Sequence, residues 1–350
     1  MPNNGIRFSR RKFLRLGSAA AVVAVMAGVG GYLAYQSAQT PGALSPKVPV
    51  TLTTNTTIDT YAPPPTRTVT PPTTTIAPNA GRTRRVPELY HTIKEALDVA
   101  SEGDTIQVGP GTYPGFDVAP YEAKPLAVKG SGVGVTIIDG FLTDSSLPTI
   151  RLNSSRVSLT GFTVKGGSHA CVIMEGAGGN EVSGNTFESP TGDSVHIHTG
   201  NNKVSNNIMK TAGAGVANHA EIGAYPHGGI NNKIVANSIE AGDIGVIINV
   251  GDNNEVRGNT IKHCATGIII SPFRQLTEGN TIFENNLVDN KIQAQDDGSN
   301  NVWYKDGKGN YWSDWTSPDD DKDGIVDKPY VIAGTAKSLN KYPLASPYQP

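Results

Sequence analysis

The sequence has few cysteines and little net charge, and both shortages exclude classes of protein. Only Cys171 and Cys264 occur in 350 residues, which is too few for a disulfide framework. Charged residues make up 17% of the chain and the formal net charge is -2, so no basic field is present to attract nucleic acid. Glycine, by contrast, occurs 40 times and asparagine is frequent, a composition that indicates many turns rather than long helices.

Residues 1–38 resemble an export signal. Arg10 and Arg11 lie in the stretch SRRKFL, before an apolar run from Leu16 to about Leu33, an order typical of a twin-arginine signal. An ordinary membrane anchor with basic flanks is the alternative. No small-residue cleavage site stands out after the run, and its length is near that of a membrane span. We expect export across the cytoplasmic membrane, to the periplasm or cell surface, with the segment either cleaved or kept as a tether.

Residues 39–86 are dominated by threonine and proline. This composition stays extended and cannot bury much apolar surface, which predicts a disordered linker. A folded domain is predicted to begin at Pro87.

A repeat of asparagine and apolar residues dominates that domain. Asparagine, an apolar residue at +2, asparagine at +5 and an apolar residue at +7 recur five times, from Asn180 to Leu287, in units of about 22 to 30 residues. Each unit offers three short strands that need stacked neighbours to bury a core. This predicts an all-β fold, a right-handed parallel β-helix over residues 87–300. The asparagine at +5 is expected in a left-handed turn, stacked as a ladder with its equivalents.

Both ends of the predicted solenoid need covers. An amphipathic helix from about Thr92 to Ala100 is expected over the first coil, and a non-repetitive cap rich in Trp and Tyr over residues 301–350.

Two stretches resemble known families. TIKEALDVASEGDTIQVGPGTY, followed by KPLAVKGSG and TIIDG, resembles the start of pectin-lyase-like β-helices. The coil repeats, with the closing GNYWSDWTSPDDDKDGIVDKPYVIAG and NKYPL, resemble the NosD family, accessory proteins linked to copper supply for nitrous oxide reductase. The resemblance covers roughly residues 87–347. It implies copper handling outside the cytoplasm, with an exported metalloenzyme or a membrane transporter complex as partner.

The stretch SVHIHTG predicts a strand with Val195 and Ile197 facing the core and with His196 and His198 on an exposed outer face. In the coil before it, Cys171 is expected to face the core. One predicted outward column then contains Val172, His196, Ala217, Ile247, Ile269 and Gln293. The other contains Met174, His198, His219, Asn249, Ser271 and Gln295. Stacked imidazoles with a thioether predict a copper site, the thioether favouring Cu(I). Tolerated surface residues, or hydrogen bonding to a sugar, are the alternatives.

The longest repeat step, 30 residues, places a loop directly after His219. Its His227 is predicted to join the copper ligands. The predicted groove residues are Glu221, Tyr225 and Asn249. A long loop at this place suits a binding site for either a metal or a glycan.

A second metal site is predicted in the stretch DDDKDGIVD. Alternating carboxylates with Gly324 at a sharp turn favour calcium, and Tyr330 at the twelfth position excludes a full EF-hand. The predicted calcium ligands are Asp319, Asp321, Asp323 and Asp327.

Catalytic groups are scarce in the predicted groove. Lyases and hydrolases on this fold need clustered aspartates or a Lys or Arg base, and Glu221 is the only nearby acid. We therefore predict a non-catalytic exported protein that handles or delivers copper. The alternative is a cell-surface protein that binds a polysaccharide, or acts on it as a lyase or epimerase.

Overall fold

The computed structural model describes residues 81–118, 125–142, 147–166, 170–176, 178–189, 192–219, 229–272, 277–316 and 318–349. Contacts divide the chain into residues 1–72 and 73–350, and every described residue belongs to the second unit. The predicted export signal with Arg10 and Arg11 lies outside the described residues, as do Glu221, Tyr225 and His227. Within the described ranges, no helix has the length and apolar character needed to cross a membrane.

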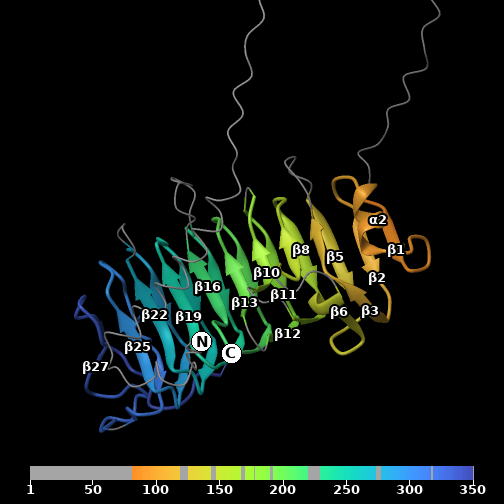
Figure 1. The fold of residues 1–350 in the computed structure, drawn as a ribbon. Coiled ribbons are helices and arrows are strands. Elements are labelled where there is room, and N and C mark those ends of the chain that lie inside the picture. The colour runs from red at the N-terminus through yellow and green to blue at the C-terminus, as the bar shows by residue number, and fades with distance from the viewer. Residues whose placement is uncertain are drawn as a thin grey trace, which may run out of the picture. The chain divides into compact units, whose positions relative to one another are not determined.

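Three parallel sheets form a β-solenoid of about nine turns, which confirms the predicted fold class (Figure 1). Sheet A contains β1 (Thr83–Val86), β2 (Thr105–Val108), β5 (Leu126–Gly130), β8 (Val157–Thr160), β11 (Glu181–Ser183), β14 (Lys203–Ser205), β17 (Lys233–Val235), β20 (Glu255–Arg257) and β23 (Thr281–Phe283). Sheet B contains β3 (Gly111–Pro114), β6 (Thr136–Asp139), β9 (Thr163–Lys165), β12 (Thr186–Ser189), β15 (Ile208–Thr211), β18 (Ser238–Ala241), β21 (Thr260–Lys262), β24 (Asn286–Val288) and β26 (Tyr311–Trp312). Sheet C contains β4 (Phe116–Val118), β7 (Ile150–Leu152), β10 (Ala170–Met174), β13 (Asp193–Ile197), β16 (Val216–His219), β19 (Ile244–Asn249), β22 (Thr266–Ser271) and β25 (Ile292–Asp296).

The core is a set of apolar columns that run along the stack of coils. Alternate residues of each short strand face inward, and equivalent residues of successive coils pair in register. The sheet A column consists of Leu159, Val182, Val204, Ile234, Val256 and Ile282, all fully buried. Each coil therefore depends on its two neighbours for most of its burial.

Two asparagine ladders follow the turns beside sheet A, as predicted. The first contains Asn180, Asn202, Asn232, Asn254 and Asn280, and the second contains Asn185, Asn207, Asn237, Asn259, Asn285 and Asn310. In each ladder the backbone N–H of one asparagine donates to Oδ1 of the next, as from Asn185 to Asn207 at 3.0 Å. The left-handed residue was misplaced, however. It is the residue before the ladder asparagine, such as Asn206 with φ of 55° or Ala236 with φ of 55°.

The first coil is covered by α2 (Ile93–Asp98), a short helix as predicted. Thr92 and Glu95 form a reciprocal capping box at its start, and Ile93 and Ala96 are buried against the coil. The only other helix of the described residues is the 3-10 turn η2 (Gly140–Leu142).

The last coil is closed by the chain beyond β25. Trp303 and Trp312 are fully buried, and Tyr330 stacks on Trp312 with ring centroids 4.0 Å apart. Tyr330 begins the small antiparallel pair β27 (Tyr330–Val331) and β28 (Leu339–Asn340). The buried carboxylate of Asp296 joins this closing segment to sheet C. It accepts hydrogen bonds from four groups, the Gly298 N–H, Asn301 Nδ2, Trp303 Nε1 and the Ser338 hydroxyl.

Candidate functional site

The histidine strand is β13, and its alternation is as predicted. Val195 and Ile197 face the core and are fully buried, while His196 and His198 belong to the opposite face of sheet C. The prediction that this face is exposed is wrong, since His196 is 4% exposed and His198 is 3% exposed. Buried imidazoles require polar partners, and the structure supplies them.

Met174 does not belong to the outward column. It pairs with Ile197, is 0% exposed and lies in the core. The alternation breaks where the chain turns into sheet C, because Cys171 and Val172 are consecutive and both pack in the core. Cys171 faces inward as predicted, but it lies one residue before the equivalent of Val195, so the rest of β10 was assigned to the wrong faces.

Ile173, rather than Val172, is therefore the neighbour of His196 in the coil before it. The pairing of His196 with Ala217, and onward to Ile247 and Ile269, is as predicted. At the far end of this column the structure places Gln295 instead of Gln293.

Each of the two histidines faces a carboxylate. His196 Nε2 lies in short contact with Asp193 Oδ2, and Asp193 Oδ1 accepts the Ala214 N–H at 2.5 Å. His198 Nδ1 lies 3.6 Å from Glu175 Oε1. The two imidazole centroids are 5.7 Å apart, with ring planes tilted by 46°.

Glu175 also lies near Arg151, whose Nε is 3.4 Å from Glu175 Oε2. The candidate site therefore contains two imidazoles, two carboxylates and one guanidinium on adjacent coils. Sequence reasoning missed Asp193 and Glu175. Asp193 opens its strand and Glu175 follows directly after one, so neither belongs to the alternating positions that were searched. Once β10 is shifted by one residue, Glu175 falls beside His198, which is the signal that could have found it.

His219 and Asn249 pair in the second outward column and continue to Ser271, as predicted. Because Ile197 pairs with Asn218, His219 follows His198 one coil further along. The side chain of His219 lies outside the described part of the structure. Asn249 is half-buried, and within the described residues its buried Oδ1 has no hydrogen-bond partner.

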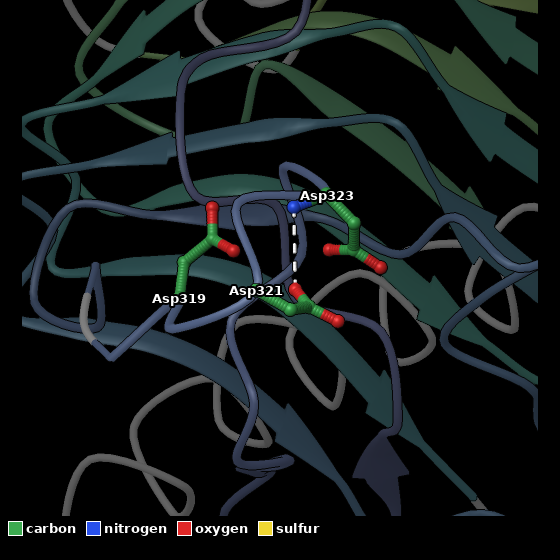
Figure 2. Close-up of side chains that lie close together, drawn as sticks. All are labelled: Asp319, Asp321 and Asp323. Carbon is green, nitrogen blue, oxygen red and sulfur yellow. Dashed lines mark hydrogen bonds between the residues drawn. The ribbon is translucent and has the colours of Figure 1, made fainter.

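The aspartates of the DDDKDGIVD stretch gather at one loop. Carboxylate oxygens of Asp319, Asp321 and Asp323 lie within 4.8 Å of one another (Figure 2). In the part of the chain that the structure describes, this is the one group of three His, Cys, Asp or Glu ligands so closely spaced. Asp327 is not in the group. Its Oδ2 accepts the N–H of Asp320 at 2.9 Å and so fastens the ends of the loop.

A β-solenoid with a pair of buried, carboxylate-linked histidines on one sheet is the class that the fold and the candidate site define. The chain belongs to the NosD family, because a family model described as periplasmic copper-binding protein (NosD) matches residues 136–317, more than half of its length. This confirms the family resemblance predicted from the sequence. The match covers most of the coils but only the start of the closing segment.

No curated protein sequence matches the chain. Among solved structures, it is similar to pectate lyase Pel9A with a TM-score of 0.42 and 11% identity, over 71% of this chain and 72% of that one. A rhamnogalacturonan lyase has a TM-score of 0.41 and 15% identity, over 66% and 69%. The A-module of the Azotobacter vinelandii mannuronan C-5 epimerase AlgE6 has 0.38 and 16%, over 70% and 81%. At these values the similarities say nothing about activity.

Proposed function

We propose that this protein is exported and that it binds copper outside the cytoplasm for transfer to a partner, without catalysing a reaction. The description of its family as periplasmic and copper-binding supports this, as does the twin-arginine pattern at Arg10 and Arg11. The partner is an exported metalloenzyme or a membrane transporter complex. The observation that carries the proposal is the pair His196 and His198, each with a carboxylate on one ring nitrogen.

The donor set fits a metal ion. Metal-binding histidines commonly present one ring nitrogen to a carboxylate, which fixes the tautomer and orients the other nitrogen toward the ion. By this rule His196 would bind through Nδ1 and His198 through Nε2. With metal–nitrogen bonds of about 2.0 Å, two imidazoles on one ion have centroids roughly 4.5–6.5 Å apart. The observed 5.7 Å falls within this range.

Further donors are proposed from the next coil. The register places His219 directly after His198 along the stack, and the loop that follows it carries Glu221, Tyr225 and His227. We place His219 and His227 among the copper ligands, and Glu221, Tyr225 and Asn249 around the ligand.

Copper retention tests the proposal. We expect the His196→Ala, His198→Ala double variant to lose most of the copper that the wild-type protein keeps through dialysis at pH 7, as measured by elemental analysis. The control is His263→Asn, because His263 also pairs with a carboxylate, Glu240, on another sheet and its φ of 57° is tolerated by asparagine. Equal copper content in the double variant and the wild type would contradict the proposal.

Saccharide binding is the second candidate function. A polar cavity of about 610 Å³ opens at the turns between sheets B and C, and Asp289, Gln293 and Asp314 are among its lining residues. Gln293 Nε2 donates to Ser313 Oγ at 3.0 Å and to Asp314 Oδ1 at 3.3 Å, which holds these groups in place for a hydroxyl-rich ligand. A protein that retains no copper but binds saccharides would favour this candidate, with or without lyase or epimerase activity.

We also propose that Asp319, Asp321 and Asp323 bind one calcium ion. Three carboxylates this close repel one another unless a cation neutralises them, and within the described residues the buried Asp319 Oδ1 accepts no hydrogen bond. Millimolar calcium should therefore raise the melting temperature by a few degrees over the value in chelator, through mass action. Asp321→Asn should reduce this response. An identical melting temperature with calcium and with chelator would contradict the calcium site.

A further inference from the structure

We infer that the ion bound by the histidine pair is cupric, Cu(II), and not cuprous, Cu(I). The inference rests on the proposed copper-binding function and specifies its cargo. It follows from the donor atoms that the fold brings to the outer face of sheet C and from those that it withholds.

Sulfur is withheld from this face among the described residues. Met174 points into the core beside Ile197, and Met209 is fully buried under sheet B. The remaining methionines, Met1 and Met26, precede the described chain. The thioether that would favour Cu(I) in the sequence-based interpretation is therefore not at the site.

The two thiols are withheld as well. Cys171 is buried, and its Sγ lies 3.3 Å from the carbonyl oxygen of Gly166 in the turn before β10. Cys264 Sγ lies 3.3 Å from the carbonyl oxygen of Lys262, and burial raises the pKa of this thiol to about 11. A thiol with so high a pKa stays protonated at neutral pH and is a poor metal ligand.

The atoms that remain are nitrogen and oxygen. His196 and His198 supply imidazoles, and Asp193 and Glu175 supply carboxylates in contact with them. Sites of imidazole and carboxylate suit divalent copper, whereas soft thioether and thiolate ligands select the cuprous ion. Cu(II) also binds such sites more tightly than the other divalent ions of the first transition row.

Asp193 has a distinct part in this site as a positioning residue, because it contacts His196 and is itself fixed by the Ala214 N–H. Loss of such a carboxylate typically weakens metal affinity by about 10–100-fold. Asp193→Asn should therefore weaken Cu(II) binding by this factor and shift its EPR parameters. The matched control is Asp117→Asn, an exposed aspartate of β4 on the same sheet.

The test compares the two oxidation states on the metal-free full chain. Cu(II) is titrated in air against a competing amino acid, and Cu(I) is titrated without oxygen against bicinchoninate. We expect Cu(II) to bind with an EPR spectrum that shows nitrogen coupling, and this signal to disappear in the His196→Ala, His198→Ala variant. Cu(I) should bind at least about tenfold more weakly than an imidazole–thioether site would require. The conservative Met174→Leu variant should leave Cu(II) binding unchanged.

The possible failures can be told apart. Tighter binding of Cu(I), or loss of copper in a folded Met174→Leu protein, overturns this inference and leaves the proposed function standing. If neither ion binds, the proposed function fails and the inference fails with it. The comparison of the two ions on the wild-type chain decides the matter even if Met174→Leu does not fold.

Discussion

Replacing Asp296 by alanine is expected to lower the free energy of unfolding by about 3–5 kcal/mol. This carboxylate is 0% exposed and accepts four hydrogen bonds, at 2.8–3.0 Å, from the last coil and the closing segment. Alanine would leave four donors, among them Trp303 Nε1 and the Ser338 hydroxyl, without an acceptor. Each buried donor left unpaired costs about 1–3 kcal/mol, and partial relaxation reduces the sum.

The measurement is urea unfolding followed by tryptophan fluorescence, since Trp303 and Trp312 are buried beside this carboxylate or its partners. Asp306→Asn serves as the control, because Asp306 is exposed and its φ of 50° suits asparagine equally well. A loss below about 1 kcal/mol in Asp296→Ala would mean that the closing segment does not depend on this carboxylate.

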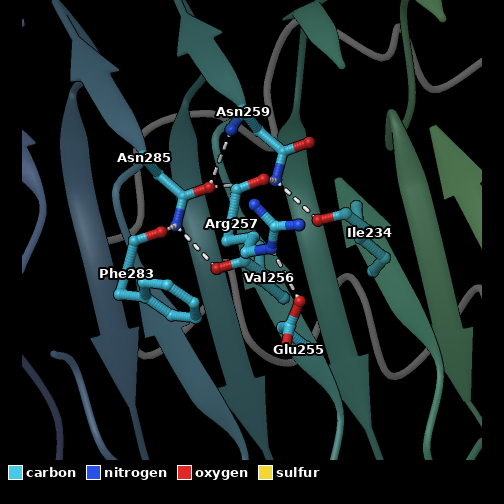
Figure 3. A network of polar contacts seen from close by, with 7 residues as sticks. All are labelled: Ile234, Glu255, Val256, Arg257, Asn259, Phe283 and Asn285. Atoms are coloured by element: carbon cyan, nitrogen blue, oxygen red, sulfur yellow. Dashed lines mark hydrogen bonds and ion pairs between the residues drawn. The ribbon is translucent and has the colours of Figure 1, made fainter. Parts of the chain in front are cut away.

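The second large effect is expected in the asparagine ladder. Asn259→Asp should destabilise the protein by about 3–5 kcal/mol at pH 7, although it replaces only one nitrogen by oxygen. Asn259 Nδ2 donates to the carbonyl oxygens of Ile234 and Arg257 at 2.8 and 3.1 Å, and to Asn285 Oδ1 at 2.9 Å (Figure 3). A carboxylate at this fully buried position would face three acceptors.

The same variant should show a characteristic pH dependence. Burial and the facing acceptors would raise the pKa of the new aspartate in the folded state above its unfolded value of about 3.9. The folded state then holds more protons than the unfolded state, so stability falls as pH rises from about 4 to 7. Asn206→Asp, at an exposed left-handed position two coils away, is the matched control. Thermal melts of both variants at pH 4 and pH 7 test this, and equal, pH-independent losses would contradict it.

The solenoid could be predicted because its signals are local and repeated. The spacing from Asn180 to Asn185 recurs in every later coil, and inward residues such as Val182 and Ile234 keep the same phase, so one misjudged coil does not hide the pattern. The position of Met174 could not be predicted this way. Its coil has Phe162 where later coils have asparagine, and two consecutive inward residues at the turn shift the phase.

The candidate site was predicted only in part, for a related reason. His196 and His198 stand out because they alternate with apolar residues. Their partners Asp193 and Glu175 occupy the beginning and the end of strands on two coils, where the sequence pattern carries no phase. Three-dimensional proximity in a solenoid arises between residues about one coil apart, so it depends on a register that a single wrong assignment can spoil.

The contacts of Asp296 have a consequence for how the chain is made. Its backbone N–H and carbonyl pair with Ala333 and Ala336, and its carboxylate accepts from Ser338, 42 residues later. Protein chains leave the ribosome N-terminus first. The coils from β1 onward can therefore stack during synthesis, whereas we expect the last coil to stay open until residue 338 has emerged. A nascent chain that stalls before that residue would carry a finished solenoid with one unfinished end.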